Sequence, residues 1–219
     1  MPPNDDLATS VSEELFWNPV VDDESIAVSA DDGRITLRGT VGSLREKREA
    51  EKAAQRVFGV VSVESRLQVK LMQGEQRADA DLRGDVLQAL MLDGLVPTTV
   101  DAQVEAGLVT LVGRAEWQYQ RDEAERVASN IVGALGVVDE IELEHPRVNA
   151  RDAEESIKNA FRRNAALDAD DLGVSVDDDT ATLTGTVGSW AEHDDAIDAA
   201  WAVAGVKSVR DEITVAYGR

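Results

Sequence analysis

The tetrapeptide Thr36-Leu37-Arg38-Gly39 decides the fold, because close variants of it return twice further along the chain. TLVG occupies residues 110–113 and TLTG occupies residues 182–185, which places the copies 74 and then 72 residues apart. Agreement at a fixed spacing indicates an internal structural repeat. The 219 residues are therefore predicted to form three tandem modules, at 1–73, 75–146 and 148–219.

Each module repeats one order of elements. Apolar residues at every fourth position, such as Leu7, Val11 and Leu15, predict an amphipathic first helix. Two alternating runs joined by a short turn, Asp31-Asp32-Gly33 in the first module, then predict a β-hairpin. A second helix with a stripe of alanine and valine follows, and a last strand completes the module. The glycines that recur at the same places are Gly39, Gly59, Gly113, Gly133, Gly185 and Gly205.

This order predicts an α+β fold of three tandem αββαβ modules. The hairpin strands pair antiparallel, whereas a helix that connects two strands of one sheet favours parallel pairing. Each module is therefore expected to be a small mixed three-stranded sheet with two helices on one face. The small residues of the second helix, Ala53 among them, allow that helix to approach the sheet closely.

The repeated pattern resembles the BON domain, a bacterial module named for osmotically inducible and nodulation proteins. The resemblance rests on Ile35-Thr36-Leu37-Arg38-Gly39-Thr40-Val41, followed later by Gly59-Val60-Val61-Ser62-Val63. The third module repeats both segments at residues 182–187 and 205–209. The second module departs from the pattern after Gly113 and after Gly133.

The resemblance implies a non-catalytic module of the bacterial envelope, associated with phospholipid surfaces and osmotic stress, with one subset linked to potassium. It carries over the glycines as positions of the fold and identifies no catalytic residue and no cofactor. It also implies a location in the bacterial envelope, as the alternative to the cytoplasmic location that the sequence itself favours.

Composition and charge narrow the function further. The net charge is -21, and because phosphate contacts require basic surfaces, nucleic acid is not an expected partner. The chain has no cysteine, which removes disulfides and thiolate metal sites. It starts with Met1-Pro2-Pro3-Asn4 rather than a basic, apolar signal and has no apolar run of transmembrane length, so a cytoplasmic location is expected.

Two histidines are the only residues that suggest catalysis. His145 precedes a proline between modules, and His193 lies on an acidic helix. Neither has a nucleophile beside it in sequence, so we expect both to face solvent and expect no enzymatic activity.

Acidic clusters suggest cation binding as the alternative function. Asp168, Asp170, Gly173 and Asp179 partly match a calcium-binding loop. Because Leu172 and Val176 occupy two ligand positions of that loop, a solvated turn is the simpler interpretation, and no metal site is assigned. Weak association of potassium or calcium with the acidic surface stays open.

A phospholipid or protein partner requires a different surface. Counted over residues 1–74, 75–148 and 149–219, the net charge is -4, -9 and -8, so the first module is the least acidic. The residues that mark its candidate surface, together with the tryptophans near element ends, are Arg45, Lys47, Arg48, Lys52, Arg56, Trp17, Trp117 and Trp190. Ion pairs along the helix, Arg45 with Glu49 and Lys47 with Glu51, are the simpler explanation of the basic residues. The tryptophans can be explained equally well by partial burial between modules.

The sequence thus predicts a non-catalytic, stress-associated binding or scaffolding protein suited to phospholipid or protein surfaces.

Overall fold

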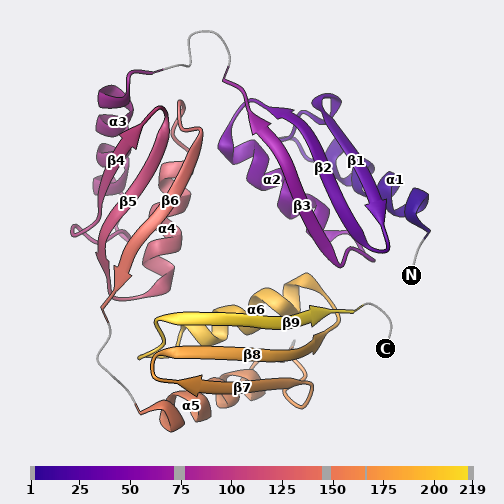
Figure 1. Ribbon diagram of the computed structural model, residues 1–219, viewed down its shortest axis with the longest axis vertical. Coiled ribbons are helices and arrows are strands. Elements are labelled where there is room, and N and C mark those ends of the chain that lie inside the picture. Colours follow the sequence, from indigo (N-terminus) through magenta and orange to yellow (C-terminus); the bar gives the residue numbers. More distant parts are fainter. Residues whose placement is uncertain (1–2, 72–76, 145–148, 166, 217–219) are drawn as a thin grey trace. The chain divides into compact units, whose positions relative to one another are not determined.

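The computed structural model describes residues 3–71, 77–144, 149–165 and 167–216 and contains three αββαβ modules (Figure 1). The predicted segments between modules, around Gln73 and around Pro146, lie outside these residues, as does His145. The first module contains α1 (Asn4–Phe16), a short 3₁₀ turn (Asp23–Ser25), β1 (Ile26–Asp31), β2 (Arg34–Val41), α2 (Leu44–Arg56) and β3 (Ser62–Val69). The second contains α3 (Asp79–Leu92), β4 (Asp101–Glu105), β5 (Leu108–Ala115), α4 (Gln118–Ser129) and β6 (Gly136–Leu143). The third contains α5 (Ala150–Arg163), β7 (Leu172–Asp177), β8 (Thr180–Val187), α6 (Trp190–Trp201) and β9 (Ser208–Val215).

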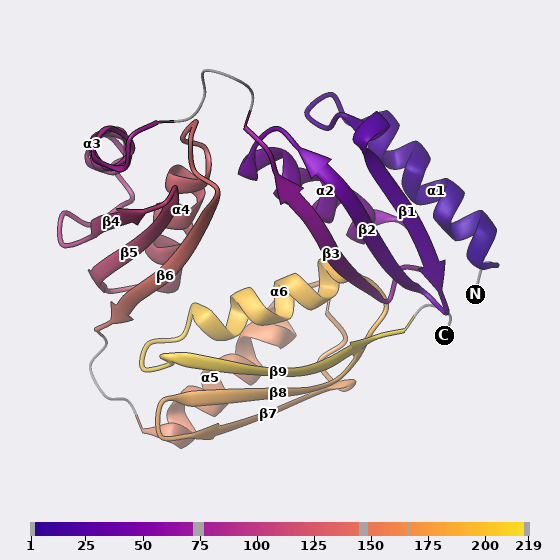
Figure 2. The ribbon, with the colours of Figure 1, turned by 45° about the horizontal axis from the view of Figure 1, so that its top comes forward.

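The strand pairing confirms the predicted α+β fold. Each sheet has the hairpin strands antiparallel and the last strand parallel to the middle one, in the orders β1-β2-β3, β4-β5-β6 and β7-β8-β9. Two helices cover one face of each sheet, as Figure 2 shows for α5 and α6. Among the described residues of each module, no helix covers the other face of its own sheet (Figure 1, Figure 2), and we call this face the open face.

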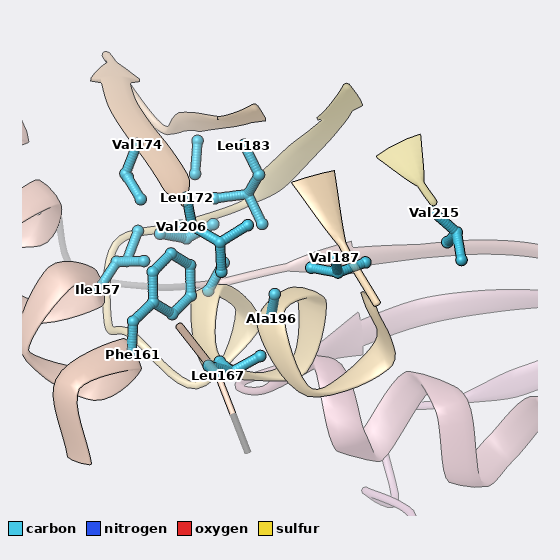
Figure 3. Packing of buried hydrophobic residues seen from close by; sticks show 12 residues of the cluster. Ile157, Phe161, Leu167, Leu172, Val174, Leu183, Val187, Ala196, Val206 and Val215 are labelled. Carbon is cyan, nitrogen blue, oxygen red and sulfur yellow. The ribbon is translucent and has the colours of Figure 1, made fainter. Parts of the chain in front are cut away.

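Each module has its own apolar core. In the first, Leu7, Val11 and Leu15 of α1 are buried against Ile35 and Leu37 of β2. Figure 3 shows the corresponding core of the third module, where Ile157 and Phe161 of α5 meet strand residues such as Leu183. Seven alanines of the second helices are fully buried, namely Ala50, Ala53, Ala54, Ala124, Ala128, Ala196 and Ala200. Their size lets the helix backbone lie close to the sheet.

The repeated glycine of the middle strand marks a close approach of two backbone segments. Gly39 has φ +140°, and a Cβ atom there would lie 2.0 Å from the carbonyl oxygen of Ser25. Gly113 and Gly185 meet Thr99 and Asp171 in the same way. A side chain at this position is therefore excluded by both the dihedral angle and the available space.

The hairpin turns use the left-handed conformation. Asp32 has φ 45° and is followed by Gly33, and Ala106 precedes Gly107 in the same arrangement. The third module has no glycine in its turn, and there Asp178 adopts φ 52°. Aspartate accepts this conformation more readily than most residues, so the turn persists.

A hydrogen-bonded cap begins the second helix. Ser43 caps α2 by accepting from the amide of Glu46, and the Glu46 carboxylate accepts in return from the amides of Gly42 and Asp22. Ser189 and Glu192 repeat the local part of this arrangement at α6. This Ser-x-x-Glu pattern is a variant of the capping box, in which the glutamate accepts from the amide before the cap residue rather than from the amide of the cap residue itself.

Candidate functional site

Large apolar side chains are exposed at the end of the first helix of two modules. Phe16, the last residue of α1, is 62% exposed, and Trp17, its C-cap, is 78% exposed. The two rings contact each other edge-to-face with centroids 5.2 Å apart. Burial of such surface is strongly favourable, so an exposed pair of this kind is suited to a partner.

The second module presents the same kind of pair at the equivalent place. Met91 and Leu92, at the end of α3, are 83% and 79% exposed. The third module instead has Arg162 and Arg163 there, both exposed at the end of α5. We call these residues the helix-end pairs. The position is therefore accessible in all three modules, and its chemistry changes from apolar to cationic.

The basic residues of α2 lie in different surroundings. Arg45, Lys52 and Arg56 are exposed, whereas Lys47 and Arg48 are half-buried. Neither expected ion pair along the helix forms between these described residues, so the interpretation of Arg45 with Glu49 and Lys47 with Glu51 was wrong. The structure describes all of α2, and none of its exposed basic side chains forms an ion pair with a carboxylate of the same helix.

Arg48 and Arg56 contact residues of other helices. Within the compact unit 2–143, Arg48 donates to Ser129 Oγ at 2.9 Å and pairs with Glu125 of α4. Arg48 therefore departs from the candidate lipid set. Arg56 Nε lies 3.8 Å from Glu14 Oε1 of α1, which brings the basic helix beside the helix that carries Phe16 and Trp17.

Arg126 of the second module occupies the position of Lys52, and acids hold it. Arg126 pairs with Glu123 and lies 3.7 Å from Asp93, the C-cap of α3. Hydrogen bonds from Arg126 lower the pKa of Glu123, so that carboxylate stays ionised and keeps the cation paired. The apolar pair of this module therefore has acidic neighbours.

The other two candidate tryptophans are less exposed than Trp17. Trp117 caps α4 and is half-buried. Trp190 is half-buried at the start of α6, packs against the third core and contacts the His193 ring with centroids 4.8 Å apart. Trp190 therefore contributes to packing within its own module.

His193 is buried, so the expectation that it faces solvent was wrong. Its exposure is 8%, and its Nε2 lies 2.8 Å from Asp211 Oδ2 of β9. The second module has Arg121 and Asp139 at the equivalent positions, with a shortest distance of 2.7 Å. The position thus joins the second helix to the last strand. The offset of 72 residues between these modules aligns Arg121 with His193 and Asp139 with Asp211, so the repeat itself could have indicated this pair.

The acidic loop of the third module forms a hydrogen-bonded turn. Asp168 Oδ1 accepts from the amide of Asp170, and the Asp168 carbonyl accepts from the amide of Asp171. Leu172 and Val176 belong to β7. Among the described residues, no group of three or more His, Asp or Glu side chains is arranged to hold a metal ion.

The same described ranges contain no helix that is both long and apolar enough to cross a bilayer.

Comparison with known proteins agrees with this architecture. The fold defines a tandem array of small α+β modules, and the BON domain family model matches residues 3–70, 78–144 and 149–217. The chain belongs to the BON domain family. Osmotically-inducible protein Y of Escherichia coli strain K12 is 32% identical over 140 residues, which cover 62% of this chain and 70% of that protein.

Solved structures offer weaker likenesses. One is a structure of CdsD, described as a structural protein of the type III secretion system of Chlamydia trachomatis. The match covers 98% of this chain and 94% of the CdsD chain. The sequence identity is 13% and the TM-score is 0.29. A second structure, of the CdsD C-terminal domain, gives 12% and 0.28. Scores at this level carry no argument about fold or function.

Proposed function

We propose that this chain is a non-catalytic, stress-associated binding protein whose first module docks on phospholipid surfaces. The observation that carries the proposal is the exposed Phe16–Trp17 pair beside the basic helix α2. Aromatic side chains favour the boundary between headgroups and acyl chains, and basic side chains are attracted to anionic headgroups. The family relative named for osmotic induction supports the association with stress.

Charge is the reason why we propose the first module, rather than the second, as the phospholipid-binding module. It is the least acidic of the three, and Arg45, Lys52 and Arg56 are exposed on α2. In the second module the corresponding apolar pair lies beside acids that hold Arg126. An anionic surface repels the second module more strongly than the first, so the two apolar pairs are not equivalent toward lipid.

Co-sedimentation of the full chain with anionic vesicles tests the proposal. The double variant Phe16→Gln, Trp17→Gln is expected to weaken vesicle binding roughly ten-fold or more, because it removes the apolar surface that would be buried. Lys52→Gln is expected to weaken binding roughly five-fold, because one basic side chain near an anionic surface contributes about 1 kcal/mol.

The second module supplies the matched control. Met91→Gln, Leu92→Gln removes an equally exposed pair and is expected to leave vesicle binding nearly unchanged. Raising the salt concentration should weaken binding of the native chain by screening. Absence of pelleting at every salt concentration, or equal losses in both double variants, would contradict the proposal.

A further inference from the structure

The open face of the second sheet differs from the open faces of its two neighbours. Alternation along β5 and β6 places Leu108, Gly136 and Val138 on this face, opposite to the buried Val109 and Leu111. Leu108 is 44% exposed and Val138 is 39% exposed. Figure 1 shows β5 and β6 side by side with their helices behind them.

These apolar residues form one continuous surface. Leu108 pairs with Gly136 in the parallel register, and Val138 lies two residues further along β6 on the same face. A Cβ atom on Gly136 would lie 2.9 Å from Leu108 Cδ1, so the leucine lies over bare backbone. Leu135, also exposed, lies against Gly107 at the end of the same strands. We call Leu108 and Val138 the apolar patch.

The neighbouring modules carry polar or charged residues at the two sheet positions of the patch. Arg34 pairs with Ser62 in the first module, and Thr180 pairs with Ser208 in the third, where the second module has Leu108 and Gly136. Val138 corresponds to Glu64 and to Arg210. The fold therefore does not require apolar side chains here, and their presence in one module points to binding.

The charged residues around the patch indicate what kind of partner it could bind. Within β4 to β6, all of which the structure describes, the charged residues of the open face are Asp101, Glu105, Arg114, Glu140 and Glu142. Four of these five are acidic, and residues 75–148 together have a net charge of -9. An apolar centre with an acidic border complements a segment that carries both apolar and basic side chains.

We propose that the open face of the second sheet binds a protein segment rich in leucine or valine and in lysine or arginine. The apolar side chains of the segment cover Leu108 and Val138, and its basic side chains lie over Glu105 and Glu140. This site differs from the lipid site of the first module in its position and in the sign of its charge. The two sites are therefore testable independently.

The full chain and a short fluorescent peptide of alternating leucine and lysine test the proposal by fluorescence anisotropy. The key variant is Leu108→Arg, Val138→Glu, which introduces the residues that the first module carries at these positions, Arg34 and Glu64. It leaves the net charge unchanged, so non-specific attraction of the peptide is preserved. It is expected to weaken peptide binding roughly ten-fold or more by removing the apolar contacts.

Three controls make the outcome decisive. A peptide of alternating glycine and lysine has the same charge and is expected to bind roughly ten-fold or more weakly than the leucine peptide. Met91→Arg, Leu92→Glu alters another exposed apolar pair of the same module without changing the charge, and should leave peptide binding unchanged. Circular dichroism should show that both double variants keep the native fold.

Other occupants would give different results. A concentration-dependent dimer that forms in the native chain and not in Leu108→Arg, Val138→Glu would assign the face to a second copy and overturn the proposal. Loss of vesicle pelleting in that variant would assign the face to membrane and overturn it as well. Equal binding of the leucine peptide by the native chain and the variant would also contradict it.

Discussion

At the residue scale, the modules differ in the pair of residues that joins the second helix to the last strand. The second helix and last strand are joined by Arg121 with Asp139 in the second module and by His193 with Asp211 in the third. The first module has Lys47 and Ser65 at these positions. Ser65 Oγ is buried and has no hydrogen-bond partner. The first module therefore has a buried polar atom at this strand position but lacks the helix-to-strand pair that the other two modules form.

This difference predicts opposite effects of two alanine substitutions. Ser65→Ala should leave the free energy of unfolding unchanged or raise it by up to about 1 kcal/mol, because it removes an unpaired buried hydroxyl. Asp139→Ala should lower it by about 1–3 kcal/mol, because it leaves the largely buried Arg121 guanidinium without its partner. Urea unfolding measures both. A loss in Ser65→Ala as large as that in Asp139→Ala would contradict the account.

Residue-scale features were also the hardest to predict from sequence. His193 was expected to face solvent, because its partner Asp211 lies on a strand and only alignment of the modules reveals the pair. Arg48 was assigned to a lipid surface, because Glu125 and Ser129 belong to another module. Contacts between residues far apart in sequence leave no periodic pattern, whereas Gly39 and its equivalents were visible through their repetition.

At the element scale, the start of α2 combines a local cap with a distant contact. Glu46 is buried and accepts hydrogen bonds from Gly42, within the capping box, and from Asp22, which follows α1. One carboxylate thus fixes both the helix start and the segment that leads from Trp17 to β1. The elements themselves were predictable, because alternation and helical periodicity follow directly from burial of one face.

Substitution of the capping carboxylate tests this role. Glu46→Ala should lower the free energy of unfolding by about 1–3 kcal/mol, since it leaves two amide groups without their acceptor. Glu192→Ala, at the equivalent cap of α6, should cost less, because the contact with a distant amide is specific to Glu46. Thermal unfolding of both variants provides the comparison, and equal losses would contradict the role of the Asp22 contact.

At the scale of the whole molecule, three similar modules carry different surfaces. The shared skeleton of glycines and buried alanines accounts for the fold, and the BON domain family was identifiable from it. The binding chemistry that we propose lies in the positions that the fold leaves free. The helix-end pairs are aromatic, aliphatic and cationic in turn, and only the second open face carries the apolar patch. Sequence periodicity did not indicate these surfaces, because it marks buried positions rather than exposed ones.

The fluorescence of Trp17 tests the central claim, docking of the first module on phospholipid, most directly. Anionic vesicles should shift the emission of the full chain to shorter wavelength and protect it from a water-soluble quencher, because the exposed Trp17 ring enters a less polar environment. The same vesicles should cause little change in Trp17→Phe, which retains the other three tryptophans. An emission spectrum of the native chain that vesicles leave unchanged, or an equal shift in Trp17→Phe, would contradict the claim.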